Sequence, residues 1–88
     1  MPLTERTYRK AEVRVTGPDV PPAAYNPVRV AVVGDVVRLF DPQDGLEVAT
    51  LTPDVEIAYS DGIAVYRESS TGTEWYVERI GCGCGGQD

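Results

Sequence analysis

Val28-Arg-Val-Ala-Val-Val-Gly-Asp-Val-Val-Arg-Leu-Phe40 is the stretch of the chain that decides the fold. Valine recurs at every second position from Val28 to Val32, which is the period of a β-strand with one buried face. Gly34-Asp35 then supplies residues that tolerate a tight reversal, and a second apolar run follows over Val36–Phe40. Two short apolar runs joined by such a turn predict an antiparallel hairpin.

The rest of the chain repeats this pattern of short strands and turns. Thirteen of the 88 residues are valine, which favours pleated, half-buried surfaces. No segment shows the period of an amphipathic helix. Strands are expected over residues 10–16, 28–33, 36–40, 46–51, 55–59, 63–67 and 73–80. The sequence therefore predicts an all-β protein, a small antiparallel barrel or sandwich of about six to seven short strands.

The segment Val33-Gly-Asp-Val-Val-Arg-Leu39 resembles the opening strand of many small SH3-like barrels. The resemblance covers seven residues and implies that residues 28–80 form a barrel. Residues 1–27 are expected to lie outside it, as an extended N-terminal arm with one strand and a connector. Four prolines between residues 17 and 27 oppose regular structure in that connector. Residues 81–88, rich in glycine and cysteine, are expected to form a flexible tail.

The chain contains no histidine. Imidazole is the usual general base near neutral pH and a frequent metal ligand. Serine–histidine and cysteine–histidine nucleophiles and histidine-ligated metals are therefore excluded. No other nucleophile–base pair can be assembled from these side chains with ordinary chemistry, so we expect a protein that is not an enzyme.

The two cysteines, Cys82 and Cys84, lie in the tail Gly81-Cys-Gly-Cys-Gly-Gly86. A disulfide between cysteines two positions apart is strained, so a structural bridge within the pair is disfavoured. Two thiolates could bind zinc or copper(I), with the remaining ligands supplied by carboxylates or by a second chain. They could equally act in redox chemistry, bridge neighbouring subunits, or be two thiols without a special role. The sequence leaves these alternatives open.

The net charge of −6 is divided unevenly along the chain. Residues 1–16 carry four basic and two acidic side chains, whereas the remaining 72 residues carry four basic and twelve acidic ones. A basic segment on an acidic body favours association with copies of itself or with an acidic partner. The acidic body argues against nucleic acid as the main ligand. The candidate partner-binding residues are the basic Arg6, Arg9, Lys10 and Arg14 and the aromatic Tyr25, Trp75 and Tyr76.

These features favour a structural or assembly module that binds other protein subunits, as a homo-oligomer or in a larger assembly. An extended arm is stabilised when it lies on a neighbouring subunit, because ordering a free segment costs about 1 to 2 kcal/mol per residue. The expected setting is a bacterial virus particle, in capsid decoration, cementing or head–tail joining. Two alternatives remain: a thiol-based metal-binding or redox protein that uses Cys82 and Cys84, and a small acidic inhibitor or host-interaction protein.

Neither a signal peptide nor a membrane-spanning segment is evident in the sequence. The N-terminal residues lack the apolar core of a secretory signal. No run approaches the roughly 18 apolar residues needed to cross a bilayer. We therefore expect a soluble protein of the cytoplasm or of a virion.

Overall fold

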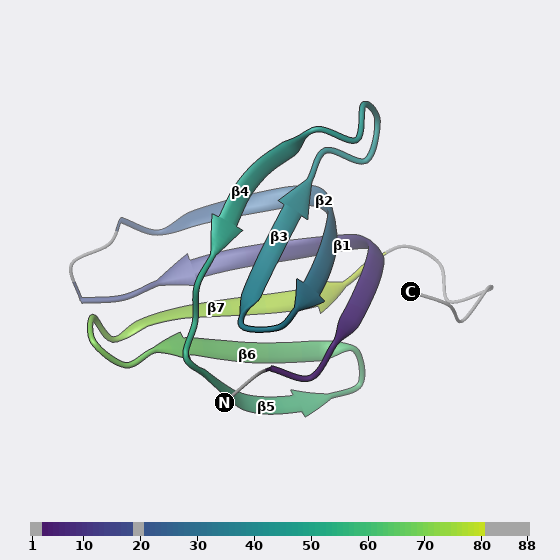
Figure 1. Ribbon diagram of the computed structural model, residues 1–88. Coiled ribbons are helices and arrows are strands. Elements are labelled where there is room, and N and C mark those ends of the chain that lie inside the picture. Colours follow the sequence, from purple (N-terminus) through teal and green to yellow (C-terminus); the bar gives the residue numbers. More distant parts are fainter. Residues whose placement is uncertain (1–2, 19–20, 81–88) are drawn as a thin grey trace.

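The computed structural model describes residues 3–18 and 21–80, and within these residues the chain is all-β without a helix. Seven antiparallel strands form one sheet in the order β4-β3-β2-β1-β7-β6-β5 (Figure 1). The expectation of an antiparallel all-β protein with about six to seven strands is confirmed. The strands are β1 (Arg6–Thr16), β2 (Ala23–Val33), β3 (Val36–Phe40), β4 (Glu47–Leu51), β5 (Val55–Ser60), β6 (Ile63–Glu68) and β7 (Thr73–Arg79).

The sheet is open at both ends. Among the described residues, β4 pairs with β3 alone and β5 pairs with β6 alone, so these two strands are the edges. A barrel requires a hydrogen-bond ladder that closes on itself, and the strand pairings do not show one. The resemblance of residues 33–39 to an SH3-like barrel strand therefore bears on the local β2–β3 hairpin and not on the closure of the sheet.

The expected N-terminal arm is wrong, because β1 is the central strand of the sheet and lies between β2 and β7. The alternating Ala11, Val13 and Val15 are all buried, as their spacing predicts. Such a face is stable only when another layer covers it, and here the covering layer is part of the same sheet. β1 thus belongs to the core of the domain.

Paired irregularities in β1 and β2 allow this long ribbon to bend. The register shifts between Tyr8 and Ala11 of β1 and again between Ala11 and Val13. The first shift adds a residue in β1 at Arg9–Lys10, and the second adds one in β2 at Asn26–Pro27. The expected proline-rich connector is therefore shorter than residues 17–27, because a bulge accepts a proline that cannot donate to the ladder.

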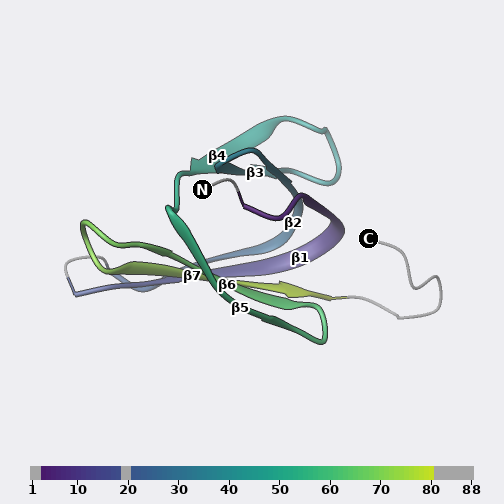
Figure 2. The same cartoon turned by 60° about the horizontal axis from the view of Figure 1, so that its bottom comes forward.

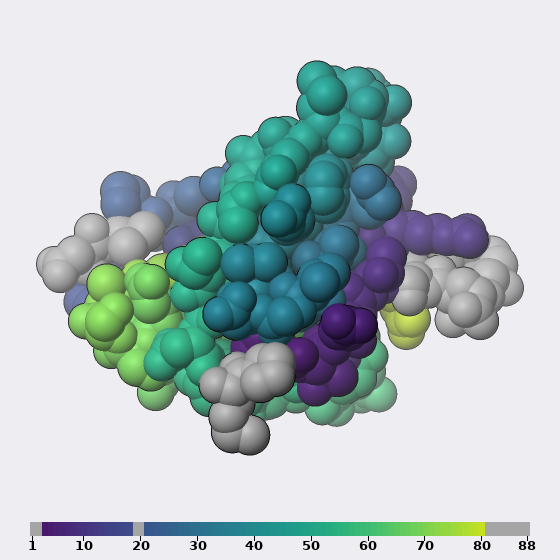
Figure 3. Space-filling view, viewed as in Figure 1, coloured from purple at the N-terminus to yellow at the C-terminus, as the bar shows by residue number. Residues whose placement is uncertain are grey.

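The core lies between two parts of the same sheet. The β3–β4 hairpin stands over one face of the layer formed by β1, β7 and β6 (Figure 2), and its atoms cover that face in the space-filling view (Figure 3). Valine is the commonest inward side chain, and Tyr66 and Leu39 are the largest that are fully buried. Burying one such apolar side chain contributes about 1.5 to 3 kcal/mol, so the alternation of apolar residues holds the two parts together.

The turn between β5 and β6 fixes their register. Asp61 and Gly62 have φ angles of 53° and 79°, the left-handed conformation that both central residues of a type I′ hairpin turn adopt. This turn places Ser60 opposite Ile63. The ladder then shifts between Glu56 and Ala58, so β5 also contains a bulge.

Candidate protein-binding surface

One face of the layer formed by β1, β7 and β6 is turned away from the β3–β4 hairpin (Figure 2). In β7, Thr73, Trp75 and Val77 are buried, so the intervening side chains point to the opposite side of the sheet. We call this exposed side the outer face. It is formed by Glu12 and Arg14 of β1, Glu74, Tyr76 and Glu78 of β7, and Ile63, Val65 and Arg67 of β6.

Tyr76 lies at the centre of the outer face. The register places it directly opposite Arg14 on one side and Val65 on the other. Tyr76 is 38% exposed, and Ile63, two positions from Val65 on β6, is 39% exposed. The outer face therefore combines an accessible aromatic ring with neighbouring apolar side chains.

The charged residues of the outer face are paired with one another. Arg14 Nη2 lies 3.2 Å from Glu12 Oε1 and 3.4 Å from Glu78 Oε1. Arg67 Nη2 donates to Glu74 Oε2 at 2.8 Å. These pairs lie around Tyr76, and their three carboxylates and two guanidinium groups leave a net charge of −1.

A hydrogen bond connects the ring at the centre to one of these pairs. The hydroxyl of Tyr76 donates to Glu74 Oε1 at 3.1 Å. The hydrogen bonds from Arg67 and then from Tyr76 lower the pKa of Glu74 from its ordinary value. The same carboxylate raises the pKa of Tyr76. The ring is thus held in one orientation by a charge-assisted hydrogen bond.

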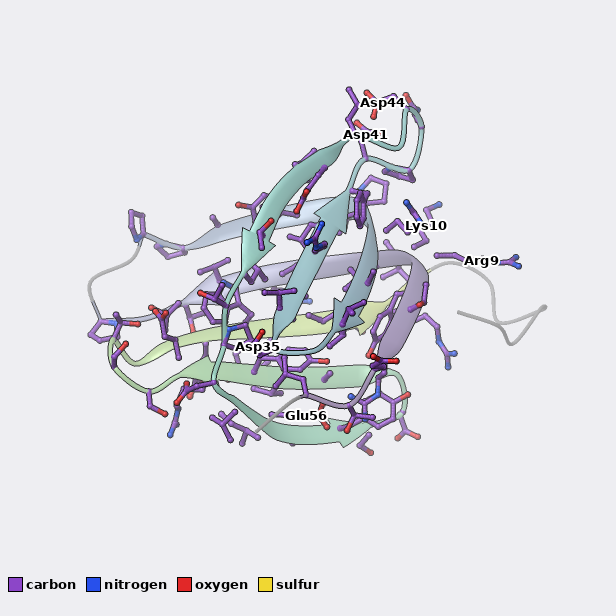
Figure 4. All side chains as sticks on the ribbon, in the orientation of Figure 1. Arg9, Lys10, Asp35, Asp41, Asp44 and Glu56 are labelled. Carbon is purple, nitrogen blue, oxygen red and sulfur yellow. The ribbon has the colours of Figure 1, made fainter. Side chains whose placement is uncertain are left out.

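The structure brings two of the seven candidate partner-binding residues into direct opposition, namely Arg14 and Tyr76. Arg9 and Lys10 are exposed at the bulge of β1 and point away from the sheet (Figure 4). Tyr25 is half-buried and packs against the core opposite Val13. These residues therefore do not form one continuous site.

Trp75 and Arg6 are placed differently from what a partner-binding role requires. Trp75 is buried in the core, because it lies on the inner face of β7. The guanidinium of Arg6 contacts Glu56 of β5 at 2.7 Å and lies 3.6 Å above the ring of Tyr59. Only 17% of the Arg6 side chain and 19% of the Glu56 side chain are exposed. We call Arg6, Glu56 and Tyr59 the Arg6 cluster. The sequence does not predict this cluster, because Arg6 and Glu56 are 50 residues apart in the chain.

Two buried phenols lie close to the Arg6 cluster. The hydroxyls of Tyr8 and Tyr66 are buried, and neither makes a hydrogen bond of normal geometry within the described residues. Burial is the main reason that the pKa of each phenol is raised. For Tyr66 the nearby Arg6 opposes this shift without reversing it. Both rings remain neutral at physiological pH and act as core side chains.

A cleft of about 440 Å³ adjoins the Arg6 cluster. Arg6, Tyr8 and Tyr59 contribute to its wall, together with Val32 and Val33. The guanidinium of Arg6 is already occupied by a carboxylate and an aromatic ring. An anionic ligand would have to displace Glu56, so the geometry favours a structural role for this cluster.

Cys82 and Cys84, the candidate zinc or copper(I) ligands, lie outside the described residues. Within residues 3–18 and 21–80, no group of three or more cysteine, aspartate and glutamate side chains is arranged to hold a metal ion. No helix in that part of the chain is long and apolar enough to cross a membrane. Comparisons of the chain with protein-family models, curated proteins and solved structures found no match.

Proposed function

We propose that the chain is a non-enzymatic module that binds another protein subunit through the outer face. The observation that carries this proposal is the exposed Tyr76 ring with apolar neighbours inside a border of paired charges. Aromatic residues at the centre of a polar border are typical of protein–protein interfaces. A fixed tyrosine also loses little side-chain entropy on binding.

The ion pairs of the outer face favour its burial by a partner. An unpaired charge that is buried at an interface costs several kcal/mol. Arg14 and Arg67 already contact carboxylates of the same face, so a partner does not have to neutralise each guanidinium itself. The outer face is formed by strands β1, β7 and β6, so no loop has to move to expose it.

We further propose that the partner belongs to a multi-subunit assembly, and the setting that we favour is a bacterial virus particle. In that setting the chain would decorate or cement a capsid, or join a head to a tail. The support is the small size of the domain and its all-β architecture, which is an argument by analogy of fold. The expected arm no longer supports it, because β1 is part of the core.

The test is recovery of the chain within an assembly. Particles or complexes from the producing cells are separated by density-gradient sedimentation, and the chain is quantified against the other subunits. We expect a fixed ratio to those subunits in the high-mass fraction. In a reconstitution with the same subunits, Tyr76→Ala should weaken binding roughly 30-fold or more, as for a central interface residue.

Val48→Ala is the matched control, because Val48 is 50% exposed on β4, outside the outer face. It should bind as the unsubstituted chain does. A chain that sediments at its own mass of 9.5 kDa, or equal binding of the Tyr76→Ala and Val48→Ala variants, would contradict the proposal.

A further inference from the structure

The edge strand β5 is unusually apolar for a strand that is open on one side. It contains no buried residue, and Val55, Ile57 and Tyr59 are 39%, 45% and 47% exposed. Edge strands are commonly protected from pairing by proline, or by lysine and other charged residues that project from them. β5 contains neither lysine nor proline.

The single charged residue of β5, Glu56, is held by a residue of the same chain. Its carboxylate contacts Arg6 at 2.7 Å, and that guanidinium also covers the ring of Tyr59. Glu56 therefore does not project a free charge toward an approaching strand. The other edge, β4, differs in this respect, because Glu47 on it is exposed and lies 3.9 Å from Arg38.

The backbone of β5 has hydrogen-bonding groups available on its open side. In a two-residue hairpin the pair next to the turn, here Ser60 and Ile63, exchanges hydrogen bonds. Because antiparallel ladders alternate, the N–H and C=O of Tyr59 face the open edge. The bulge adds one residue between Glu56 and Ala58, so the groups of Glu56 face the same edge.

We propose that β5 pairs with β5 of a second copy of the chain, antiparallel about a twofold axis. In the register that the open backbone groups allow, Glu56 lies opposite Tyr59 of the second copy, and Ile57 lies opposite Ala58. Such a contact is self-complementary, because each copy presents the same segment to the other. The result is a continuous sheet across two molecules.

The spacing of the open backbone groups selects a second copy as the occupant, because the bulge separates Glu56 from Tyr59 by three positions and a second β5 presents the same spacing. Each Arg6 lies on its own Tyr59, so in this register the guanidinium of one copy lies next to Glu56 of the other. The two Arg6 guanidinium groups and the two Glu56 carboxylates then alternate in sign along the contact between the two β5 strands. The added ladder can be no longer than β5 itself, Val55–Ser60, so the dimer is small in area and belongs to the weak, transient class.

The proposal goes beyond the proposed function, because it uses the edge of β5 and not the outer face. The test is the mass of the full chain in solution, measured by sedimentation equilibrium with reductant at concentrations up to about 1 mM. We expect the mass to rise toward twice 9.5 kDa. Ile57→Lys places a charge on the open edge and should weaken dimerisation at least tenfold, whereas Val48→Lys on β4 should leave it unchanged.

Amide hydrogen exchange of the unsubstituted chain tests the same contact without relying on a variant. The amides of Glu56 and Tyr59 should exchange more slowly as the concentration rises, and those of β4 should not. A chain that stays monomeric at the highest concentration, or a dimer that Ile57→Lys leaves intact in a folded variant, overturns the inference. A monomeric chain whose Tyr76→Ala variant still loses its assembly partner would leave the proposed function standing.

Discussion

Val13→Ala measures how much the domain depends on β1. Val13 is fully buried on β1, where it lies opposite Tyr25 of β2 and Val77 of β7. The substitution removes two methylene equivalents, a transfer free energy of about 1.6 kcal/mol. Because neighbours on both sides are held by ladders, the cavity closes only in part, and the total loss should be about 2 to 3 kcal/mol.

That loss is a large share of the stability of a domain of this size. The free energy of unfolding for 88 residues is roughly 4 to 13 kcal/mol. With a urea dependence of about 1 to 2 kcal/mol per molar, the unfolding midpoint should fall by roughly 1 to 3 M. The fluorescence of Trp75, which is buried in the same core, reports the transition.

Val33→Ala is the control, because Val33 is 53% exposed at the end of β2. Its effect should stay within about 0.5 kcal/mol. If residues 1–27 were an arm outside the domain, both variants would unfold at nearly the same urea concentration. That result would refute the placement of β1 at the centre of the sheet.

Two further predictions concern charged groups. Glu56→Gln leaves Arg6 without its carboxylate, and both side chains are less than one-fifth exposed. The free energy of unfolding should therefore fall by about 1 to 2 kcal/mol. Glu47→Gln removes a carboxylate from an exposed pair and should change that free energy by less than about 0.5 kcal/mol in the same urea titration. Arg67 lowers the pKa of Glu74 on folding. This carboxyl therefore stabilises the fold fully above pH 4.5, which is its pKa in the unfolded chain. The stabilisation is lost as the pH falls from there through the lower pKa of the folded state. Glu74→Gln should therefore flatten the loss of stability below pH 4.5, and an unchanged acid titration would contradict the ion pair.

Local features of the fold could be predicted from the sequence because they depend on neighbouring residues. The range of β3 and the turn at Gly34-Asp35 follow from alternation and from turn-forming residues alone. The opposite faces of Trp75 and Tyr76 follow from the period of two. The same period indicates that these two residues cannot both face a partner.

Long-range pairing could not be predicted from such local signals. The alternation along β1 does not predict that this strand lies between β2 and β7. An open sheet and a barrel use the same strands and turns, and they differ only in whether the last ladders meet. The opposition of Arg14 and Tyr76, which defines the outer face, likewise depends on a pairing between distant segments.

The side-chain accessibility of Tyr76 within an assembly reports directly whether the outer face is buried by a partner. Hydroxyl-radical footprinting compares the oxidation rate of this ring in the free chain, where it is 38% exposed, with the rate in the complex. We expect oxidation of Tyr76 to become at least tenfold slower in the complex, while Leu46, which is 66% exposed before β4, is oxidised as before. An equal rate for Tyr76 in the free and bound chain would contradict binding through the outer face.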